Sequence, residues 1–115
     1  MRKVAIFAFK ANPICFIHVL LNALDLHEKG ADVKIVLEGE ATGLVTDLRK
    51  IEHPLNKLYA KTKDLALVHA VCRACAVKMG SLQAVEEEGL SLADEMSGHA
   101  GMAPYIKQDY EIITL

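Results

Sequence analysis

Short apolar runs alternate with longer amphipathic segments along this chain, and this alternation constrains the fold more than any other feature of the sequence. Short apolar runs are typical of strands that are buried on both faces, and the longer segments between them are typical of helices. Together they indicate βα units around a parallel sheet. We therefore expect an α/β fold with five strands and helices on both faces. The strands are expected at Val4–Phe9, Val33–Leu37, Leu65–Val71, near Leu90–Ala93 and at Glu111–Thr114.

Helix start and stop signals lie between the expected strands. Asn12 offers a side-chain cap, Pro13 occupies the favoured first helical position, and Gly30 is suited to end that helix. Four helices are expected at Pro13–Lys29, Thr42–Lys50, Pro54–Lys63 and Arg73–Met79. Another helix is expected to start from a cap at Ser81, and a last one to start near Ser97 and end at about Gln108. In parallel sheets ligands and chemistry gather at the carboxyl ends of the strands, so we look for the site in the loops that follow them.

The first expected helix, Pro13–Lys29, is apolar almost all round. Its apolar positions cover more than the stripe of about 100° that a surface helix buries, which indicates contact with a partner chain. These positions are Phe16, Ile17, Val19, Leu20, Leu21, Ala23, Leu24 and Leu26. The segment Ile14–Leu26 contains polar residues and is shorter than the ~20 residues that span a bilayer. We therefore expect a homo-oligomer and no membrane span.

Composition narrows the class of protein further. With 115 residues, 52% of them apolar and 24% charged, the sequence predicts one globular domain over residues 1–115. A net charge of −2, with three Tyr, three Phe and no Trp, argues against a nucleic-acid partner. Three cysteines are too few for a secreted disulfide scaffold and favour a cytoplasmic protein. No glycine-rich dinucleotide loop, phosphate-binding loop or hydrolase elbow is present.

The sharpest chemical signal is the motif Cys72-Arg73-Ala74-Cys75, which lies where the third strand gives way to a helix. Unsatisfied backbone N–H groups and the positive end of the helix favour a thiolate at such a position, and Arg73 adds a neighbouring cation. The second thiol lies one helical turn on, where it could form a disulfide or resolve a persulfide. The spacing alone leaves three interpretations open, namely a redox pair, half of a zinc site or two small packing residues.

Histidines and a third cysteine could join this motif. His99 follows the fourth strand, so it could reach the same crevice and deprotonate Cys72 or bind an acceptor. In the simpler alternative Ser97 caps the last helix and His99 is solvated. Cys15 and His18 lie one turn apart in the first helix, and with Cys72 and Cys75 they could hold tetrahedral zinc. The simpler alternative for this pair is a buried small residue and a partly exposed histidine.

The segment from Val71 to Gly80 resembles the stretch after the third strand in the DsrE/DsrF-like family, which includes sulfur-relay subunits. The resemblance extends over nearly the whole chain. It includes the opening strand, the helix that Pro13 starts, Glu38-Gly39, Met96-Ser97 and the closing Tyr110–Leu115. In that family a cysteine directly after the third strand, eight residues before a glycine, carries sulfur as a persulfide; Cys72 and Gly80 match this spacing.

This resemblance implies a three-layer α/β/α sandwich with a five-stranded parallel sheet, assembled as a trimer or hexamer. It implies that Cys72 carries sulfane sulfur between a donor and an acceptor protein, with Cys75 as a resolving thiol and no dissociable cofactor. The family's position matching Cys75 is not always a cysteine. The competing hypothesis is an oligomeric binding or scaffold protein whose cysteines pack or hold zinc.

Overall fold

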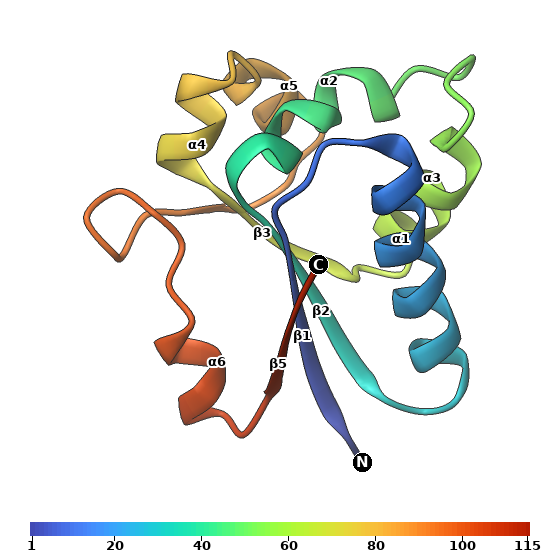
Figure 1. Ribbon diagram of the computed structural model, residues 1–115, viewed down its shortest axis with the longest axis vertical. Coiled ribbons are helices and arrows are strands. Elements are labelled where there is room, and N and C mark those ends of the chain that lie inside the picture. The colour runs from blue at the N-terminus through green and yellow to red at the C-terminus, as the bar shows by residue number, and fades with distance from the viewer.

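The computed structural model describes residues 1–115 and contains one sheet of five parallel strands in the order β4-β3-β2-β1-β5 (Figure 1). The strands are β1 at Lys3–Ala8, β2 at Asp32–Leu37, β3 at Val68–Cys72, β4 at Leu92–Ala93 and β5 at Glu111–Thr114. The expected five-stranded parallel α/β fold is therefore confirmed. Because all strands run in the same direction, their carboxyl ends share one edge of the sheet, and the loops from β2, β3 and β4 meet there.

Helices cover both faces of this sheet, which gives three layers. The helical segments are α1 at Pro13–Glu28, the 3₁₀ segment η1 at Gly39–Leu44, α2 at Val45–Leu48, α3 at Asn56–Asp64, α4 at Arg73–Lys78, α5 at Leu82–Glu87 and α6 at Ala103–Lys107. All of these except α6 contribute to one core, while α6 lies alone on the opposite face (Figure 1). That second face buries a smaller cluster, which includes Phe7, Cys72 and Tyr105.

The first helix begins as its sequence predicts. Asn12 accepts a hydrogen bond from the Ile14 amide at 2.8 Å, and Pro13 follows it as the first helical residue. The inner face buries Phe16 and Leu20, while Ile14 is 77% exposed on the outer face. Of the eight apolar positions named above, only Leu21 is exposed in the structure, among polar residues such as His18, Asn22 and Asp25, and the partner chain stays a prediction. No helix in the structure combines the length and the hydropathy that crossing a bilayer requires.

The third strand is shorter and less buried than the sequence indicates. It begins at Val68 and not at Leu65, and His69 within it is exposed. The cause is the end of α3, where Ala66 adopts a left-handed conformation with φ of 59° and Leu67 donates back to the Thr62 carbonyl at 3.0 Å. Such helix ends normally carry glycine, so the alanine concealed this turn in the sequence.

Other helix boundaries also differ from the predicted ones. The expected helix over Thr42–Lys50 is a 3₁₀ segment followed by the short α2, because the chain turns at Gly39, whose φ is 54°, and winds tightly from there. Ser81 stands at the start of α5 but does not cap it, since its hydroxyl hydrogen-bonds the Ala76 carbonyl at 3.4 Å. The last helix begins at Ala103 and does not involve Ser97.

Candidate functional site

The two cysteines of the motif lie at the junction between β3 and α4. Cys72 is the last residue of β3 and the N-cap of α4. Its backbone is still extended (φ −60°, ψ 119°), and the helical conformation begins at Arg73. Its side chain is completely buried in the smaller core, whereas Cys75, one turn into α4, is half-buried. The sequence therefore predicted the positions of both sulfurs, and the structure adds that they differ in exposure.

A short hairpin delivers His99 to these sulfurs. Met96 and His99 exchange backbone hydrogen bonds at 2.9 Å in both directions, and the two residues between them, Ser97 and Gly98, have φ of 51° and 90°. Positive φ at both central residues is the pattern of a type I′ turn. The Gly98 carbonyl accepts from the Ala74 amide at 2.9 Å, which attaches the hairpin to the first turn of α4. The alternative in which Ser97 caps the last helix is therefore wrong.

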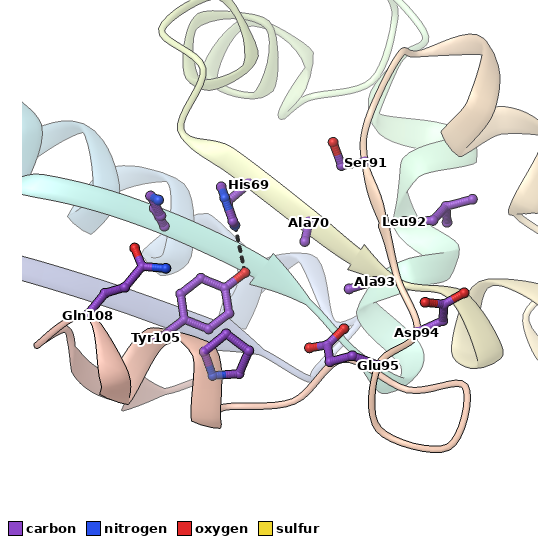
Figure 2. A pocket seen from close by; sticks show the side chains of 11 residues that line it. His69, Ala70, Ser91, Leu92, Ala93, Asp94, Glu95, Tyr105 and Gln108 are labelled. Carbon is purple, nitrogen blue, oxygen red and sulfur yellow. Dashed lines mark hydrogen bonds between the residues drawn. The ribbon is translucent and has the colours of Figure 1, made fainter.

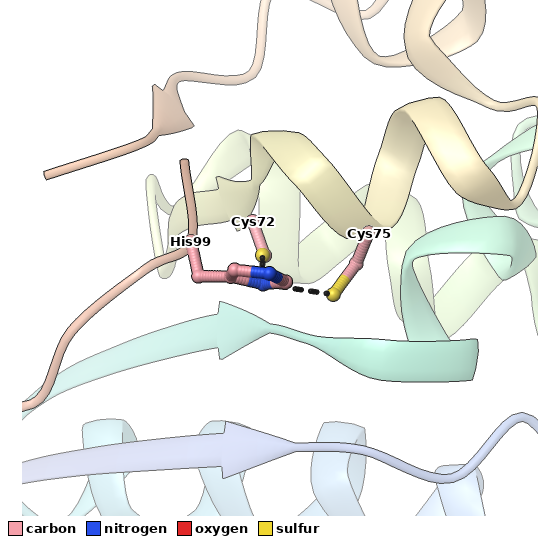
Figure 3. Close-up of side chains that lie close together, drawn as sticks. All are labelled: Cys72, Cys75 and His99. Atoms are coloured by element: carbon pink, nitrogen blue, oxygen red, sulfur yellow. Dashed lines mark hydrogen bonds between the residues drawn. The ribbon is translucent and has the colours of Figure 1, made fainter. Parts of the chain in front are cut away.

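His99, Cys72 and Cys75 form one compact cluster (Figure 3). The Nδ1 atom of His99 lies 3.3 Å from the Cys72 sulfur and 3.6 Å from the Cys75 sulfur, and the three atoms all lie within 4.8 Å of one another. A neutral imidazole with its lone pair on Nδ1 can accept a proton from a thiol, and one protonated there can donate to a thiolate. The expectation that His99 reaches the same crevice as Cys72 is confirmed.

Burial shifts two acidic groups near His99, the Cys75 thiol and the Glu38 carboxyl, toward their neutral forms by raising the pKa of each. Burial raises the pKa of the Cys75 thiol, the nearby Cys72 side chain raises it further, and the backbone of Gly39 opposes the shift. Cys75 therefore remains a thiol at neutral pH. Burial also raises the pKa of the Glu38 carboxyl, and the imidazole of His99 lowers it.

Glu38 is a site residue that the sequence reasoning did not single out. It follows β2 directly, and only 7% of its surface is exposed. This buried carboxyl stands at the carboxyl end of a parallel strand, where the charge of His99 lowers its pKa, so Glu38 is a neighbour of the cluster. The signal in the sequence was an acidic residue that immediately ends an apolar strand.

Access to the cluster is through a small hollow. This hollow has a volume of about 370 Å³, and Cys75 and His99 line it together with Gly39, Glu40, Lys78 and Met79. Cys72 does not line it and is completely buried. A molecule that approaches the cluster therefore meets Cys75 and His99 before it meets Cys72.

A second hollow lies on the face that α6 covers (Figure 2). Its volume is about 380 Å³, and no cysteine lines it. The Nδ1 atom of His69 and the Tyr105 hydroxyl hydrogen-bond within it at 2.6 Å. Burial lowers the pKa of His69, and the charge of Lys34 adds to this effect. His69 is thus held by α6 and is separate from the cysteine cluster.

Cys15 and His18 do not approach the cluster. Both are exposed, and they line a different hollow with Thr114 and Leu115 at the end of β5. The loop that carries Cys15 follows β1, and the cysteine motif follows β3. Because β2 lies between these two strands, the loop and the motif are about 10 Å apart along the edge of the sheet. The hypothesis of a zinc site made of Cys15, His18 and the two motif cysteines is therefore wrong, and so is the expectation that Cys15 is buried.

We expect Gly98→Ala to detach the hairpin locally. A side chain at φ of 90° is strained, so this substitution should cost about 1–2 kcal/mol of unfolding free energy. The matched control is Gly30→Ala, which has φ of 94°, no atom within 4 Å of the added carbon and a similar expected cost. Amide exchange of Ala74, measured by NMR, should accelerate at least tenfold in Gly98→Ala only. Equal protection of Ala74 in both variants would contradict this role of Gly98.

Comparisons with known proteins give a family but no activity. No family model matches the chain. The uncharacterized protein MJ0733 of Methanocaldococcus jannaschii is 39% identical over 98 residues, which are 85% of this chain and 78% of that protein. An uncharacterized protein of Archaeoglobus fulgidus is 46% identical over 35 residues, which are 30% of this chain and 95% of that protein.

A solved structure supports the fold alone. BT1422 from Bacteroides thetaiotaomicron, a conserved protein of unknown function, superposes with a TM-score of 0.74 over 98% of this chain and 94% of that chain, at 16% sequence identity. The sequence identity to MJ0733 extends over most of both proteins. The chain therefore belongs to the family of this Methanocaldococcus jannaschii protein.

Proposed function

We propose that this protein is a thiol-based sulfur carrier that holds sulfane sulfur as a persulfide on Cys72. The observation that carries the proposal is the imidazole nitrogen of His99 within 3.3 Å of the Cys72 sulfur and 3.6 Å of the Cys75 sulfur. A nucleophilic thiol needs a base within hydrogen-bond reach, and the cluster supplies one. The resemblance of residues 71–80 to sulfur-relay subunits of the DsrE/DsrF-like family is consistent with the same chemistry.

Loading is a transfer of sulfane sulfur without net oxidation. His99 takes the proton from the Cys72 thiol, and the resulting thiolate attacks the outer sulfur of a donor persulfide, R–S–SH. The new bond joins Cys72 to that sulfur, while the S–S bond of the donor breaks. The departing R–S⁻ receives the proton from His99, so the products are the Cys72 persulfide and R–SH. An acceptor cysteine removes the outer sulfur by the same reaction in the reverse sense.

Cys75 sets how long the persulfide lasts. Its thiolate could attack the inner sulfur on Cys72, which would form a Cys72–Cys75 disulfide and release sulfide as HS⁻. A thiol is a much weaker nucleophile than a thiolate, and the raised pKa of Cys75 keeps it a thiol at neutral pH. The persulfide is thereby preserved for an acceptor protein.

Burial of Cys72 restricts which molecules can take part. The side chain is completely covered, and the hollow beside it opens onto Cys75 and His99. A donor or acceptor cysteine must enter this hollow and pass Cys75 and His99 to reach Cys72. This requirement favours protein partners that present a protruding cysteine over reaction with bulk oxidants.

Mass spectrometry of the loaded protein tests this function. Reduced protein is treated with cysteine persulfide in the presence of a chelator, and free thiols and persulfides are then alkylated. Trypsin cleaves after Arg73, so Cys72 and Cys75 fall in separate peptides, residues 64–73 and 74–78. We expect one added sulfur, ~32 Da, on the 64–73 peptide.

The adduct should be absent in Cys72→Ser and unchanged in Cys15→Ser, because Cys15 is exposed and lies outside the cluster. An unmodified 64–73 peptide in the wild-type protein, with or without sulfur on the 74–78 peptide, would rule out Cys72 as the carrier.

A further inference from the structure

The S···N separations in the cluster are close to those that a tetrahedral metal ion imposes. Zn–S bonds of about 2.3 Å and Zn–N bonds of about 2.0–2.1 Å at tetrahedral angles require S···N separations of about 3.6 Å and an S···S separation of about 3.8 Å. The two observed S···N separations are 3.3 Å and 3.6 Å, and all three atoms lie within 4.8 Å. The two S···N separations therefore match those of a zinc site to within a few tenths of an ångström, and the two sulfurs, which lie within 4.8 Å of each other, would close to about 3.8 Å around the ion.

The donor set also matches a thiophilic cation. Two thiolates and one imidazole suit zinc(II) and exclude magnesium and calcium, which prefer oxygen ligands. Two thiolate charges neutralise a divalent cation, which matters here because Cys72 is completely buried. We propose that Cys72, Cys75 and His99 form a zinc site with three protein ligands. This site is distinct from the four-residue set with Cys15 and His18, which the structure separates.

The orientation of His99 is suited to such a site. Its Nδ1 atom faces both sulfurs, which leaves Nε2 free for an outer hydrogen bond (Figure 3). Metal-binding histidines commonly use that second nitrogen to contact a carboxylate or a carbonyl, which fixes the ring. The Gly98 to Ala74 backbone bond holds the hairpin that carries the ring.

The fourth coordination position would be open to an outside ligand. Three protein ligands and one exchangeable position are typical of zinc sites that bind or activate a small molecule, whereas purely structural sites have four protein ligands. The hollow of about 370 Å³ beside Cys75 and His99 gives such a ligand a path from solvent. Water or a thiol is the chemical class that this position would accept.

Zinc binding goes beyond the proposed sulfur carriage and does not depend on it. Both processes use the Cys72 thiolate, so zinc binding and the loading of sulfur compete for it on the same molecule. Each sulfur that is still a thiol must release a proton when zinc binds, and the site therefore weakens as the pH falls. Oxidation of the pair to a disulfide removes both thiolates and abolishes the site.

The experiment uses fully reduced full-length protein titrated with Co²⁺ and then with Zn²⁺. A cobalt–thiolate charge-transfer band with the visible bands of a tetrahedral site should appear at one ion per chain and disappear as zinc displaces cobalt. A competition titration with a chromophoric chelator gives the zinc affinity. Cys72→Ser, Cys75→Ser and His99→Ala should each weaken zinc binding about a hundredfold or more. The matched controls Cys15→Ser and His18→Ala, both outside the cluster, should stay within twofold.

Circular dichroism of every variant checks that it is folded. A second control is wild-type protein whose Cys72 and Cys75 are joined in a disulfide, which should give no cobalt–thiolate band. The proposal is overturned if reduced wild-type protein gives no such band, or if the band persists in the Cys72→Ser/Cys75→Ser double variant. Because sulfur loading is measured with a chelator present, failure of zinc binding and failure of sulfur carriage are separate results.

Discussion

Replacing His99 with alanine is expected to slow the loading of Cys72 by cysteine persulfide about 10²–10⁴-fold at neutral pH. The imidazole nitrogen is 3.3 Å from the Cys72 sulfur, and in the proposed mechanism it removes the thiol proton. Without it, the Cys72 thiol loses the base that takes its proton, and its attack on the donor slows. The rate of appearance of the modified 64–73 peptide, followed by mass spectrometry, measures this effect.

The pH dependence separates a base from a residue that only packs over Cys72. If His99 acts as a base, the loss in His99→Ala should shrink as the pH rises, because the thiol then ionises without help. His99→Gln fills a similar volume without providing a base and should be as slow as His99→Ala. His18→Ala, on the exposed side of α1, should load at the wild-type rate. A wild-type rate in His99→Gln would show that His99 only packs against the sulfurs.

Phe7→Ala is expected to lower the free energy of unfolding by about 3–5 kcal/mol. Phe7 is completely buried at the centre of the smaller core, and its ring meets that of Tyr105 edge to face, with centroids 5.4 Å apart. Tyr105 belongs to α6, the helix that covers this face of the sheet. Removal of the ring leaves a cavity and releases the contact that holds α6 in place.

Urea unfolding followed by circular dichroism measures this loss as a lower midpoint. Phe9→Ala is the matched control, because Phe9 is 38% exposed just beyond the same strand and should cost about 1 kcal/mol or less. Equal midpoints for the two variants would mean that the face under α6 contributes little to stability.

The sequence was most informative where local patterns determine structure. The strand that ends at Cys72, the helix that follows and the Gly80 that ends that helix with φ of 73° were all predicted from residue order. Cys75 followed from helical spacing, and His99 from its place after the fourth strand. Boundaries that depend on unusual conformations were predicted less well, as the left-handed Ala66 at the end of α3 illustrates.

The order of strands across the sheet could not be predicted from the sequence. Periodicity identifies strands but does not say which are neighbours, so Cys15 and His18 were candidates for the same crevice as Cys72. The observed order places β2 between β1 and β3 and brings β5 beside β1, and the two residues therefore face the end of β5. Glu38 was named only as part of the family resemblance and not as a site residue for a related reason, since its proximity to His99 arises only when β2 and the hairpin meet in space.

The hairpin around Gly98 has a consequence for how the protein responds to warming. His99 is 27 residues from Cys72 in sequence, and a backbone bond from Ala74 to Gly98 attaches its turn to α4. Segments with few attachments open at a lower free energy than the fold as a whole. The dithiol should therefore become separated from its imidazole while the sheet is still intact. We therefore expect the cluster to lose its imidazole at a lower temperature than the one at which the whole domain melts.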